Sequence, residues 1–344
     1  MHMRSVRYFG QGDLRLIEAQ EPQICRPNDI KIKIAYCGVC GSDLHLKRAE
    51  FDFLADTVNG MLMGHEATGV ITELGSGATA KGLKVGDRVA FYFNEHCGNC
   101  YYCRNGQEQF CDHKTVAQGA MSDYIVVGEQ AVYKLPDSVS LQKGALIEPI
   151  SVCLHGVDMC NIKPGMSVAI SGGGAMGMII AQLALRSGAS KLTVFEPIAS
   201  KRETLKKLGV QYTIDPLSED RQEAAMKITE GRGFDVVIEA SGSAAACNGL
   251  EDLVAMGGTL EFFAAMYRPD YDYKINLFKA FMREVKIISG VLQSPYVWPR
   301  SVALSEILDL DTLLVDGCEF EAEACNEAFE AQMSGKTIKS LIKF

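Results

Sequence analysis

The sequence has no strongly basic segment and no long apolar run, and these absences exclude several classes of function. Its 34 Lys and Arg stand against 43 Asp and Glu, which gives a net charge of −9 over 344 residues. Surfaces that bind nucleic acids or anionic membranes need clustered positive charge, so neither partner is expected. No stretch of about 18 uninterrupted apolar residues is present, so no membrane-spanning helix is expected either.

The N-terminal segment lacks the apolar run of a secretory signal, because residues 1–4 lead directly into a strand-like segment. A cytoplasmic location is therefore expected. In that compartment the 12 cysteines favour metal binding over disulfides. Four of them lie within residues 97–111 and the others are scattered, which indicates one local metal site.

Two patterns divide the chain. In the first 150 residues, short apolar or alternating runs are separated by Gly, Asp and Asn turns, which predicts a β-rich region with strands at 30–35, 69–74, 88–93 and 122–127. From about residue 165, apolar runs alternate with helical segments, which predicts a doubly wound parallel sheet and thus an α/β fold. The strands expected there are 167–171, 191–196, 211–214, 235–239, 258–263 and 285–289. The helices expected there are 176–187, 199–208, 219–229 and 245–253. The tail predicts helices at 301–308 and 322–333 and a last strand at 338–344.

The most specific metal signal consists of Cys97, Cys100, Cys103 and Cys111. Two-residue spacers let neighbouring thiolates converge on one ion, and four thiolates close a tetrahedral structural zinc site. An iron–sulfur cluster also takes four thiolates, so the spacing alone leaves that alternative open. Unrelated free cysteines are the simpler alternative, which this spacing disfavours.

A second set of ligand types lies in three separate segments, at Cys40, at His65 and Glu66, and at Glu148. A thiolate, an imidazole and a carboxylate suit a zinc ion that keeps one position for water or substrate. Each of these segments also has another interpretation. Cys37 and Cys40 form a CxxC pair typical of redox sites. A His after Gly is more often a turn residue, and a Glu before Pro can cap a helix. Their combination upstream of a nucleotide fold favours the metal site.

A glycine loop, Gly172-x-Gly174-x-x-Gly177, follows an apolar strand and opens a helix. In dinucleotide-binding folds the first glycine makes the turn, the second admits the pyrophosphate and the third lets helix and strand pack closely. Met176 belongs to the same loop. Glu196 ends the next strand, about 20 residues on, where an acid binds the ribose hydroxyls. We therefore expect NAD here; a glycine turn without a ligand is the alternative.

With these motifs the chain resembles the zinc-containing medium-chain alcohol dehydrogenases, in particular their sorbitol and polyol dehydrogenase branch. The resemblance runs nearly end to end. Its further markers are 40–45, 64–66, 85–89, 148–149, 256–258 and 294–300. It implies a GroES-like β-rich catalytic domain from residues 1–150 and 290–344, and a Rossmann nicotinamide-binding domain from residues 151–289.

The resemblance also implies roles for single residues. Cys40 and His65 match catalytic zinc ligands, and Glu148 matches the acidic position of the polyol branch. Glu66 belongs to the same metal site, and which of Glu66 and Glu148 ligates zinc stays open. Ser42 and a histidine three residues later, His45, match the proton relay. Together with the four-cysteine site, two zinc ions per chain are expected.

Other positions are less directly implied. Cys37 matches no ligand and is interpreted as a packing residue, while Asp43 is interpreted as a structural carboxylate. Lys339 resembles a basic residue near the cofactor phosphates. Arg300 is expected to meet substrate hydroxyls, or else to lie on the surface while Trp298 fills the core. Two segments that enclose substrate in the family, 46–63 and the stretch between Cys111 and Ser122, depart from its usual pattern.

The function implied is oxidation of a secondary alcohol of a polyol, cyclitol or sugar (phosphate) to a ketone, with hydride transfer to NAD. The alternative within the enzyme class is a threonine-type or simple secondary-alcohol dehydrogenase. The alternative outside it is a nucleotide-binding structural or sensing protein, which the full set of ligand residues disfavours. A homodimer or homotetramer is expected from the resemblance.

Overall fold

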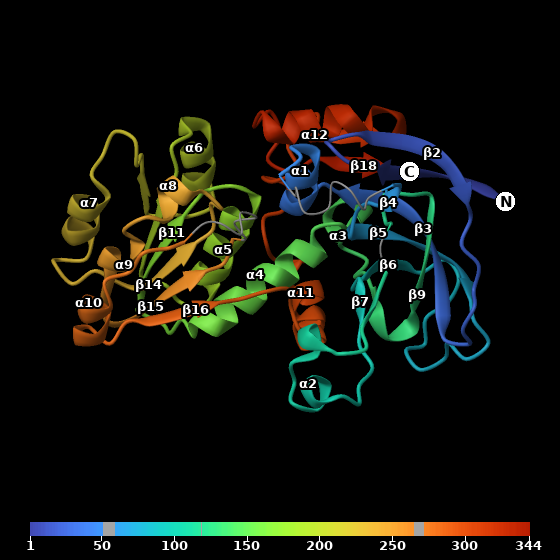
Figure 1. Cartoon of the computed structure of the whole chain (residues 1–344), viewed down its shortest axis with the longest axis horizontal. Helices are drawn as coiled ribbons and strands as arrows, with labels where there is room; N and C mark the ends of the chain where they lie inside the picture. The colour runs from blue at the N-terminus through green and yellow to red at the C-terminus, as the bar shows by residue number, and fades with distance from the viewer. Residues whose placement is uncertain (51–58, 118, 265–271) are drawn as a thin grey trace. The chain divides into compact units, whose positions relative to one another are not determined.

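The computed structural model describes residues 1–50, 59–117, 119–264 and 272–344, which form two compact units (Figure 1). Unit 1 contains residues 1–151 and 294–344, and unit 2 contains residues 152–293. The sequence-based boundaries lie at 150/151 and 289/290. Both ends of the chain belong to unit 1 (Figure 1). None of the helices in the described ranges has the length and apolar character that crossing a bilayer requires.

Unit 2 is built on a six-stranded parallel sheet in the order β13-β12-β11-β14-β15-β16. The strands are β11 (Ser167–Ser171), β12 (Lys191–Phe195), β13 (Tyr212–Ile214), β14 (Phe234–Glu239), β15 (Val254–Phe262) and β16 (Lys286–Ser289). All five residues of the central β11 are buried, as expected for a parallel strand covered on both faces. The predicted doubly wound sheet is confirmed.

The helices of unit 2 follow its strands as predicted, with one exception. They are α5 (Ala175–Arg186), α6 (Ala199–Lys207), α7 (Arg221–Ile228), α8 (Ala244–Cys247), α9 (Leu250–Leu253) and α10 (Leu277–Met282). The single helix expected at 245–253 was wrong: Gly249 takes a φ of 76° and divides it into α8 and α9. A further helix, α4 (Ile147–Cys160), begins in unit 1 and ends in unit 2.

Unit 1 is dominated by β-strands, which confirms the predicted β-rich region. Its main sheet runs in the order β10-β6-β5-β3-β18-β17, with β9 also paired to β3. Two smaller sheets have the orders β2-β1-β4 and β7-β8. The strands are β1 (His2–Tyr8), β2 (Leu14–Gln20), β3 (Asp29–Gly38), β4 (Met61–Leu62), β5 (Glu66–Leu74), β6 (Arg88–Phe91), β7 (Asn94–Glu95), β8 (Thr115–Val116), β9 (Tyr124–Gly128), β10 (Val132–Lys134), β17 (Glu319–Glu321) and β18 (Leu341–Lys343). Its core includes Ile30, Ile32, Ile34, Ile71, Val89 and Phe329.

Short helices complete unit 1. They are α1 (Gly41–Lys47), α2 (Tyr101–Arg104), α3 (Leu141–Gly144), α11 (Trp298–Leu304) and α12 (Cys325–Met333), with the 3₁₀ turns η2 (Glu108–Phe110), η3 (Glu129–Ala131), η4 (Pro295–Val297) and η5 (Ala322–Ala324). The helix expected at 301–308 is α11, which begins three residues earlier and ends at Leu304. The earlier start is possible because Pro299 fits the first turn of a helix.

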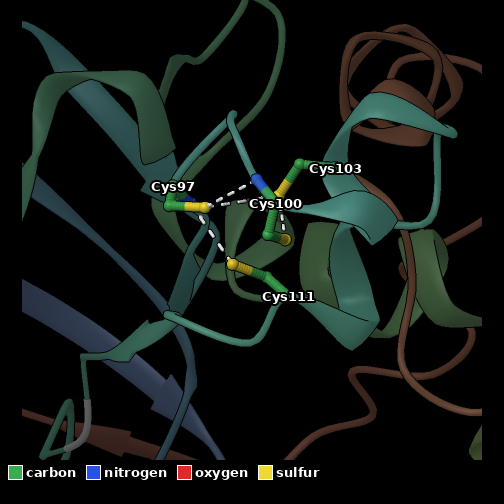
Figure 2. A group of neighbouring side chains, drawn as sticks. All are labelled: Cys97, Cys100, Cys103 and Cys111. Atoms are coloured by element: carbon green, nitrogen blue, oxygen red, sulfur yellow. Dashed lines mark hydrogen bonds between the residues drawn. The ribbon is translucent and has the colours of Figure 1, made fainter.

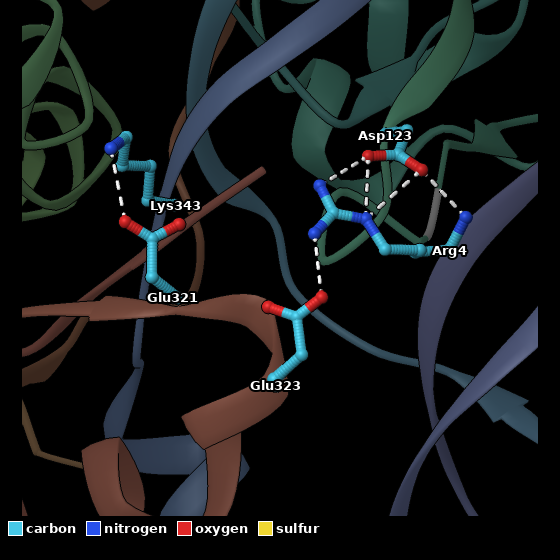
Figure 3. A network of polar contacts seen from close by, with 5 residues as sticks. All are labelled: Arg4, Asp123, Glu321, Glu323 and Lys343. Atoms are coloured by element: carbon cyan, nitrogen blue, oxygen red, sulfur yellow. Dashed lines mark hydrogen bonds and ion pairs between the residues drawn. The ribbon is translucent and has the colours of Figure 1, made fainter.

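The C-terminal segment returns to the first strands of unit 1. Strand β18 pairs antiparallel with β3 and parallel with β17. Arg4 of β1 donates to both Asp123 and Glu323, the second at 2.8 Å (Figure 3). Lys343 and Glu321 pair at 3.0 Å across β18 and β17 (Figure 3). These ion pairs are partly or fully solvent-exposed, so the buried strand pairing contributes more to stability than they do.

Candidate active site and metal centres

The first expected ligand of the catalytic zinc, Cys40, lies at the start of helix α1. Strand β3 ends at Gly38, and Cys40 takes the N-cap position of the helix with an extended backbone. The backbone N–H of Cys40 donates to the Asp43 carboxylate at 3.0 Å, which fixes the turn. Asp43 is buried, and burial raises the pKa of its carboxyl above the ordinary value although His65 opposes the shift. The sequence analysis interpreted Asp43 as a structural carboxylate, and its contact with the Cys40 N–H at the start of α1 agrees with that interpretation.

The next two expected zinc ligands, His65 and Glu66, lie at the start of strand β5, with His65 just before its first residue. Gly64, at φ 84°, precedes His65, and a Cβ at this glycine would lie within 3 Å of Met121 and of the Cys37 sulfur. The side-chain ligand atoms of Cys40, His65 and Glu66 all lie within 4.8 Å of one another. This spacing fits one metal ion with a thiolate, an imidazole and a carboxylate, which is a zinc-like donor set.

Negative charge exceeds positive charge around this cluster. Burial by itself lowers the pKa of His65, but the charges of Cys40, Asp43 and Glu148 outweigh it and hold the pKa well above the ordinary value. A histidine drawn toward its cationic form by its neighbours marks a place where a cation is stabilised. The electrostatics of the site therefore also fit a metal ion.

Glu148 lies in the first turn of α4 and is 5% exposed. Its carboxylate raises the pKa of both His65 and Lys339, so it lies within electrostatic reach of the cluster. It is not a member of the tight group of ligand atoms formed by the described residues. The structure thus brings three of the four predicted ligands together and places the charge of the fourth nearby.

Lys339 makes contacts at the metal cluster that the sequence did not reveal. Its ammonium forms a buried ion pair with Glu66 and donates to the Val39 carbonyl at 2.9 Å. A Cβ at Gly38 would lie 2.5 Å from the Glu66 carboxylate and 3.1 Å from Lys339, so only glycine leaves room for this pair. We expected Lys339 near the cofactor phosphates; the structure commits its ammonium to a metal-site carboxylate.

The proposed proton relay lies on α1. Ser42 and His45 are three residues apart on this helix, which places them on one face, and both are half-buried. The Nδ1 of His45 contacts the carboxylate of Glu50, which is exposed. His45 therefore links the buried part of the helix to a solvent-accessible acid. Segment 46–63, where a substrate-enclosing loop was expected, lies partly outside the described residues.

Cys37 does not join the cluster. It is fully buried, and burial raises the pKa of its thiol well above the ordinary value. A thiol in this state is a poor nucleophile, which disfavours a redox pair with Cys40. Trp298 is also fully buried, whereas Tyr296 and Arg300 are exposed. The core-filling alternative thus describes Trp298 better than a substrate contact does.

The four cysteines converge in a loop between β7 and β8 (Figure 2). The sulfurs of Cys100 and Cys103 are 3.5 Å apart, and those of Cys97 and Cys103 are 4.0 Å apart. Backbone N–H groups donate to the sulfurs: those of residues 99 and 100 donate to Cys97, and those of residues 97 and 113 donate to Cys111, each at 3.4 Å. Such donors favour thiolates, and the geometry fits a closed four-thiolate site.

The thiols of this loop differ in acidity. Backbone N–H groups lower the pKa of Cys100 to about 6, whereas burial and the neighbouring thiols raise the pKa of Cys103 to about 12. Four thiolates at these distances repel one another unless a cation neutralises them. The loop therefore fits a bound metal better than four free thiols.

The glycine loop of unit 2 has the expected geometry. Gly172 adopts a φ of 107°, and a Cβ there would lie 2.8 Å from the backbone of Ser241. A Cβ at Gly177 would lie 2.0 Å from the Gly172 carbonyl, so the helix and strand can approach only without one. Gly174 borders open space, which leaves its backbone accessible to a phosphate, and Met176 is half-buried in the first turn of α5.

Glu196 follows β12 and is 4% exposed. Its two carboxylate oxygens accept hydrogen bonds from the backbone N–H of Gly173 at 2.8 Å and of Ile198 at 2.9 Å. Glu196 therefore fixes the glycine loop itself. Arg202 donates to the Glu196 and Pro197 carbonyls and pairs with Asp215 at 3.3 Å.

Comparison with known proteins identifies the family. The alcohol dehydrogenase GroES-like domain matches residues 26–137, and the zinc-binding dehydrogenase domain matches residues 175–306. A D-xylulose reductase from Aspergillus niger is 31% identical, over 93% of this chain and 91% of its own. The chain belongs to the zinc-containing medium-chain alcohol dehydrogenase family. The predicted family, fold class and enzyme class are confirmed, and zinc and a nicotinamide nucleotide are the cofactors.

Two further relatives are each 29% identical. They are a sorbitol dehydrogenase from Halalkalibacterium halodurans, with 97% of this chain and 96% of the relative aligned, and a D-arabitol-phosphate dehydrogenase from Enterococcus avium, with 97% and 95% aligned. A zinc-binding dehydrogenase from Sinorhizobium meliloti bound to NADP has 27% identity, full coverage of both chains and a TM-score of 0.88.

We predict that Cys111→Ser removes the zinc of the four-cysteine loop and lowers stability, since closed zinc sites contribute folding energy directly. Metal analysis should fall from about two zinc ions per chain to about one. Cys25→Ser is the matched control, because Cys25 is exposed and outside the loop. Iron–sulfur absorbance in the freshly purified protein would contradict the zinc assignment.

We predict that Lys339→Met lowers the free energy of unfolding by about 3–5 kcal/mol, because it leaves the Glu66 charge buried and unpaired. Lys343→Met is the control: Lys343 pairs with Glu321 near the same strand end, but both side chains are exposed, so a loss of less than about 1 kcal/mol is expected. Denaturant titration measures both. Equal losses in the two variants would refute a stabilising role for the buried pair.

Proposed function

We propose that this enzyme oxidises a secondary alcohol of a polyol, cyclitol or sugar phosphate to a ketone, with NAD as the hydride acceptor. The observation that carries the proposal is the convergence of Cys40, His65 and Glu66 within 4.8 Å, with the buried charge of Glu148 close by. A carboxylate-rich donor set gives less electron density to zinc than a thiolate-rich one, so the metal stays electrophilic enough to bind two oxygens of a diol.

The names of the relatives support this substrate class. The two relatives aligned over 97% of this chain are named for sorbitol and D-arabitol phosphate, and a third is named for D-xylulose. All three are polyhydroxylated compounds, and one carries a phosphate. Identities of 29–31% support the class of substrate and not a single compound.

The chemistry follows from the placement of the side chains. Cys40, His65 and Glu66 would hold a zinc ion, which would lower the pKa of an alcohol hydroxyl, and the glycine loop would hold a nicotinamide nucleotide, which would accept the hydride from the carbon that carries this hydroxyl. Ser42 accepts the hydroxyl proton and passes it to His45. The contact between His45 and Glu50 then gives the proton a path to solvent. Lys339 holds Glu66 in place through its ammonium and limits the negative charge at the site.

NAD is the proposed cofactor because of Glu196. Its carboxylate, held by Gly173 and Ile198, keeps lone pairs that can accept from ribose hydroxyls, and its charge repels a 2′-phosphate. Arg202 is engaged with backbone carbonyls and Asp215, so it is not free to bind that phosphate. The relative from Sinorhizobium meliloti, which is bound to NADP, makes this preference a point to test.

A homodimer or homotetramer is also proposed. Among the described residues, exposed apolar side chains gather on α10 and β16 of unit 2, at Leu277, Phe278, Phe281, Met282 and Ile287. An apolar surface of this kind on a globular enzyme is typical of a subunit interface, and sedimentation of the purified protein distinguishes the states. The cytoplasmic location stays a prediction.

We predict a larger kcat/KM with NAD than with NADP, by at least about tenfold, since a carboxylate beside the ribose opposes the extra phosphate. Glu196→Gln should reduce this ratio by weakening both the ribose contact and the repulsion. Glu203→Gln removes a charge from the exposed surface of α6 and should leave the ratio unchanged. A wild-type preference for NADP would overturn the assignment.

We predict that sorbitol, galactitol, inositols or their phosphates have a higher kcat/KM than 2-propanol and 2-butanol. A site built to pair with several hydroxyls discriminates strongly against a substrate that lacks them. Absorbance at 340 nm follows the reaction with each alcohol. Faster turnover of the simple alkanols, or of threonine, would favour the alternative alcohol or threonine-type activity and would leave the zinc–nicotinamide chemistry intact.

A further inference from the structure

A hydrogen bond joins the four-cysteine loop to a distant segment of unit 1. Glu108 lies between Cys103 and Cys111 in the turn η2, so the residues that hold the metal also fix its backbone. The hydroxyl of Ser294, 186 residues later in the chain, donates to the Glu108 carboxylate. Ser294 is fully buried and Glu108 is half-buried, so the contact is shielded from water on one side.

Ser294 is the first residue of a compact turn. Its carbonyl accepts from the N–H of Val297 at 3.2 Å and thereby closes η4, which leads directly into α11. Trp298 begins α11. A fixed Ser294 therefore fixes the start of the segment that carries Trp298.

Aromatic contacts continue from Trp298 to the metal site. The Trp298 ring stacks on Tyr133 at 5.1 Å and lies 5.8 Å from the ring of Tyr92. Tyr92 lies 5.8 Å from Phe93, whose ring is 5.0 Å from that of His65. These residues all belong to unit 1, so the contacts form a continuous series from the four-cysteine loop to a zinc ligand.

The electrostatics agree with this arrangement. Burial is the main cause that raises the pKa of the Tyr92 phenol, and the carboxylates of Glu148 and Glu108 raise it further. Tyr92 is thus within reach of one carboxylate from the metal site and one from the four-cysteine loop. Its phenol remains neutral and can donate a hydrogen bond at neutral pH.

We propose that Glu108 is a positioning residue of the active site: through Ser294 and Trp298 it orders Tyr92 and Phe93 beside His65. The four-cysteine loop then contributes to substrate binding as well as to stability. This inference rests on the proposed function for its effect on the alcohol, but the link from Glu108 to Trp298 is independent of the substrate.

The chain offers a direct readout, because Trp298 is its single tryptophan. The fluorescence of Trp298 reports the order of the segment without any assay of activity. The test compares Glu108→Gln and Ser294→Ala with Asp112→Asn. Asp112 is an exposed acid next to Cys111, so this control removes the same charge from the same loop without touching Ser294.

Glu108→Gln and Ser294→Ala should each shift the Trp298 emission and raise its quenching by acrylamide, while Asp112→Asn should behave as wild type. The KM for the best polyol should rise about tenfold in both variants with kcat within about twofold, as expected for loss of a charge-assisted hydrogen bond that orders the binding site. The double variant should add little to either single one, because both act on one contact. Two zinc ions per chain in every variant would show that positioning, not metal loss, is measured.

Identical fluorescence and KM in Glu108→Gln and Asp112→Asn would overturn the proposal. A fluorescence change without a KM change would also overturn it, since the segment would then be ordered without consequence for substrate. If Trp298 responds to Glu108→Gln but the wild-type enzyme oxidises no polyol, the proposed function fails and the link from Glu108 to Trp298 stands.

Discussion

The pairing of three strands holds the catalytic metal centre together. Strand β3 lies between β5 and β18, and its last residue, Gly38, is opposite Glu66 on one side and Leu341 on the other. This register brings residues from distant parts of the chain to one strand end, where Glu66 and Lys339 meet in the space that the glycine leaves. Cys40 follows two residues later, so a slip of β5 against β3 would separate the ligands, and a slip of β18 would move Lys339 away from Glu66.

Charge balance is the second constraint on this centre. Several buried acids surround one thiol and one imidazole, and Lys339 supplies part of the opposite charge. A bound metal dication would supply the rest, which would couple metal binding to the folding of unit 1. The ion pair with Lys339 leaves Glu66 less free to act as a constant ligand, and Glu148, in the first turn of α4, adds its negative charge to the same site.

The sequence predicted those features that local patterns encode. Spacing identified the four cysteines, and the strand–loop–helix pattern placed Gly172, Gly174 and Gly177, because each depends on residues close in the chain. The helix at 245–253 failed because Gly249 interrupts it, which an averaged helical pattern does not reveal. The partner of Lys339 could not be predicted, since it depends on the register of β18 against β3, and a single basic residue before a strand carries no signal for that register.

The contact between Glu108 and Ser294 also could not be predicted from the sequence, because it depends on packing between distant segments and not on a local pattern. Glu108 is a non-ligand position within the four-cysteine motif and Ser294 opens the distant marker 294–300, so no local pattern connects the two residues. Their proximity follows from two independent features: the cysteines fold the loop into a turn that presents residue 108, and the C-terminal return brings residue 294 back to unit 1. In our proposal, this contact couples the four-cysteine loop to the catalytic metal site, because it joins two segments that are far apart in the sequence. The hydrogen bond from the buried Ser294 to Glu108 is a contact of the four-cysteine loop with a segment outside it. Through this contact, a metal that orders the loop would also order the segment that begins at Ser294.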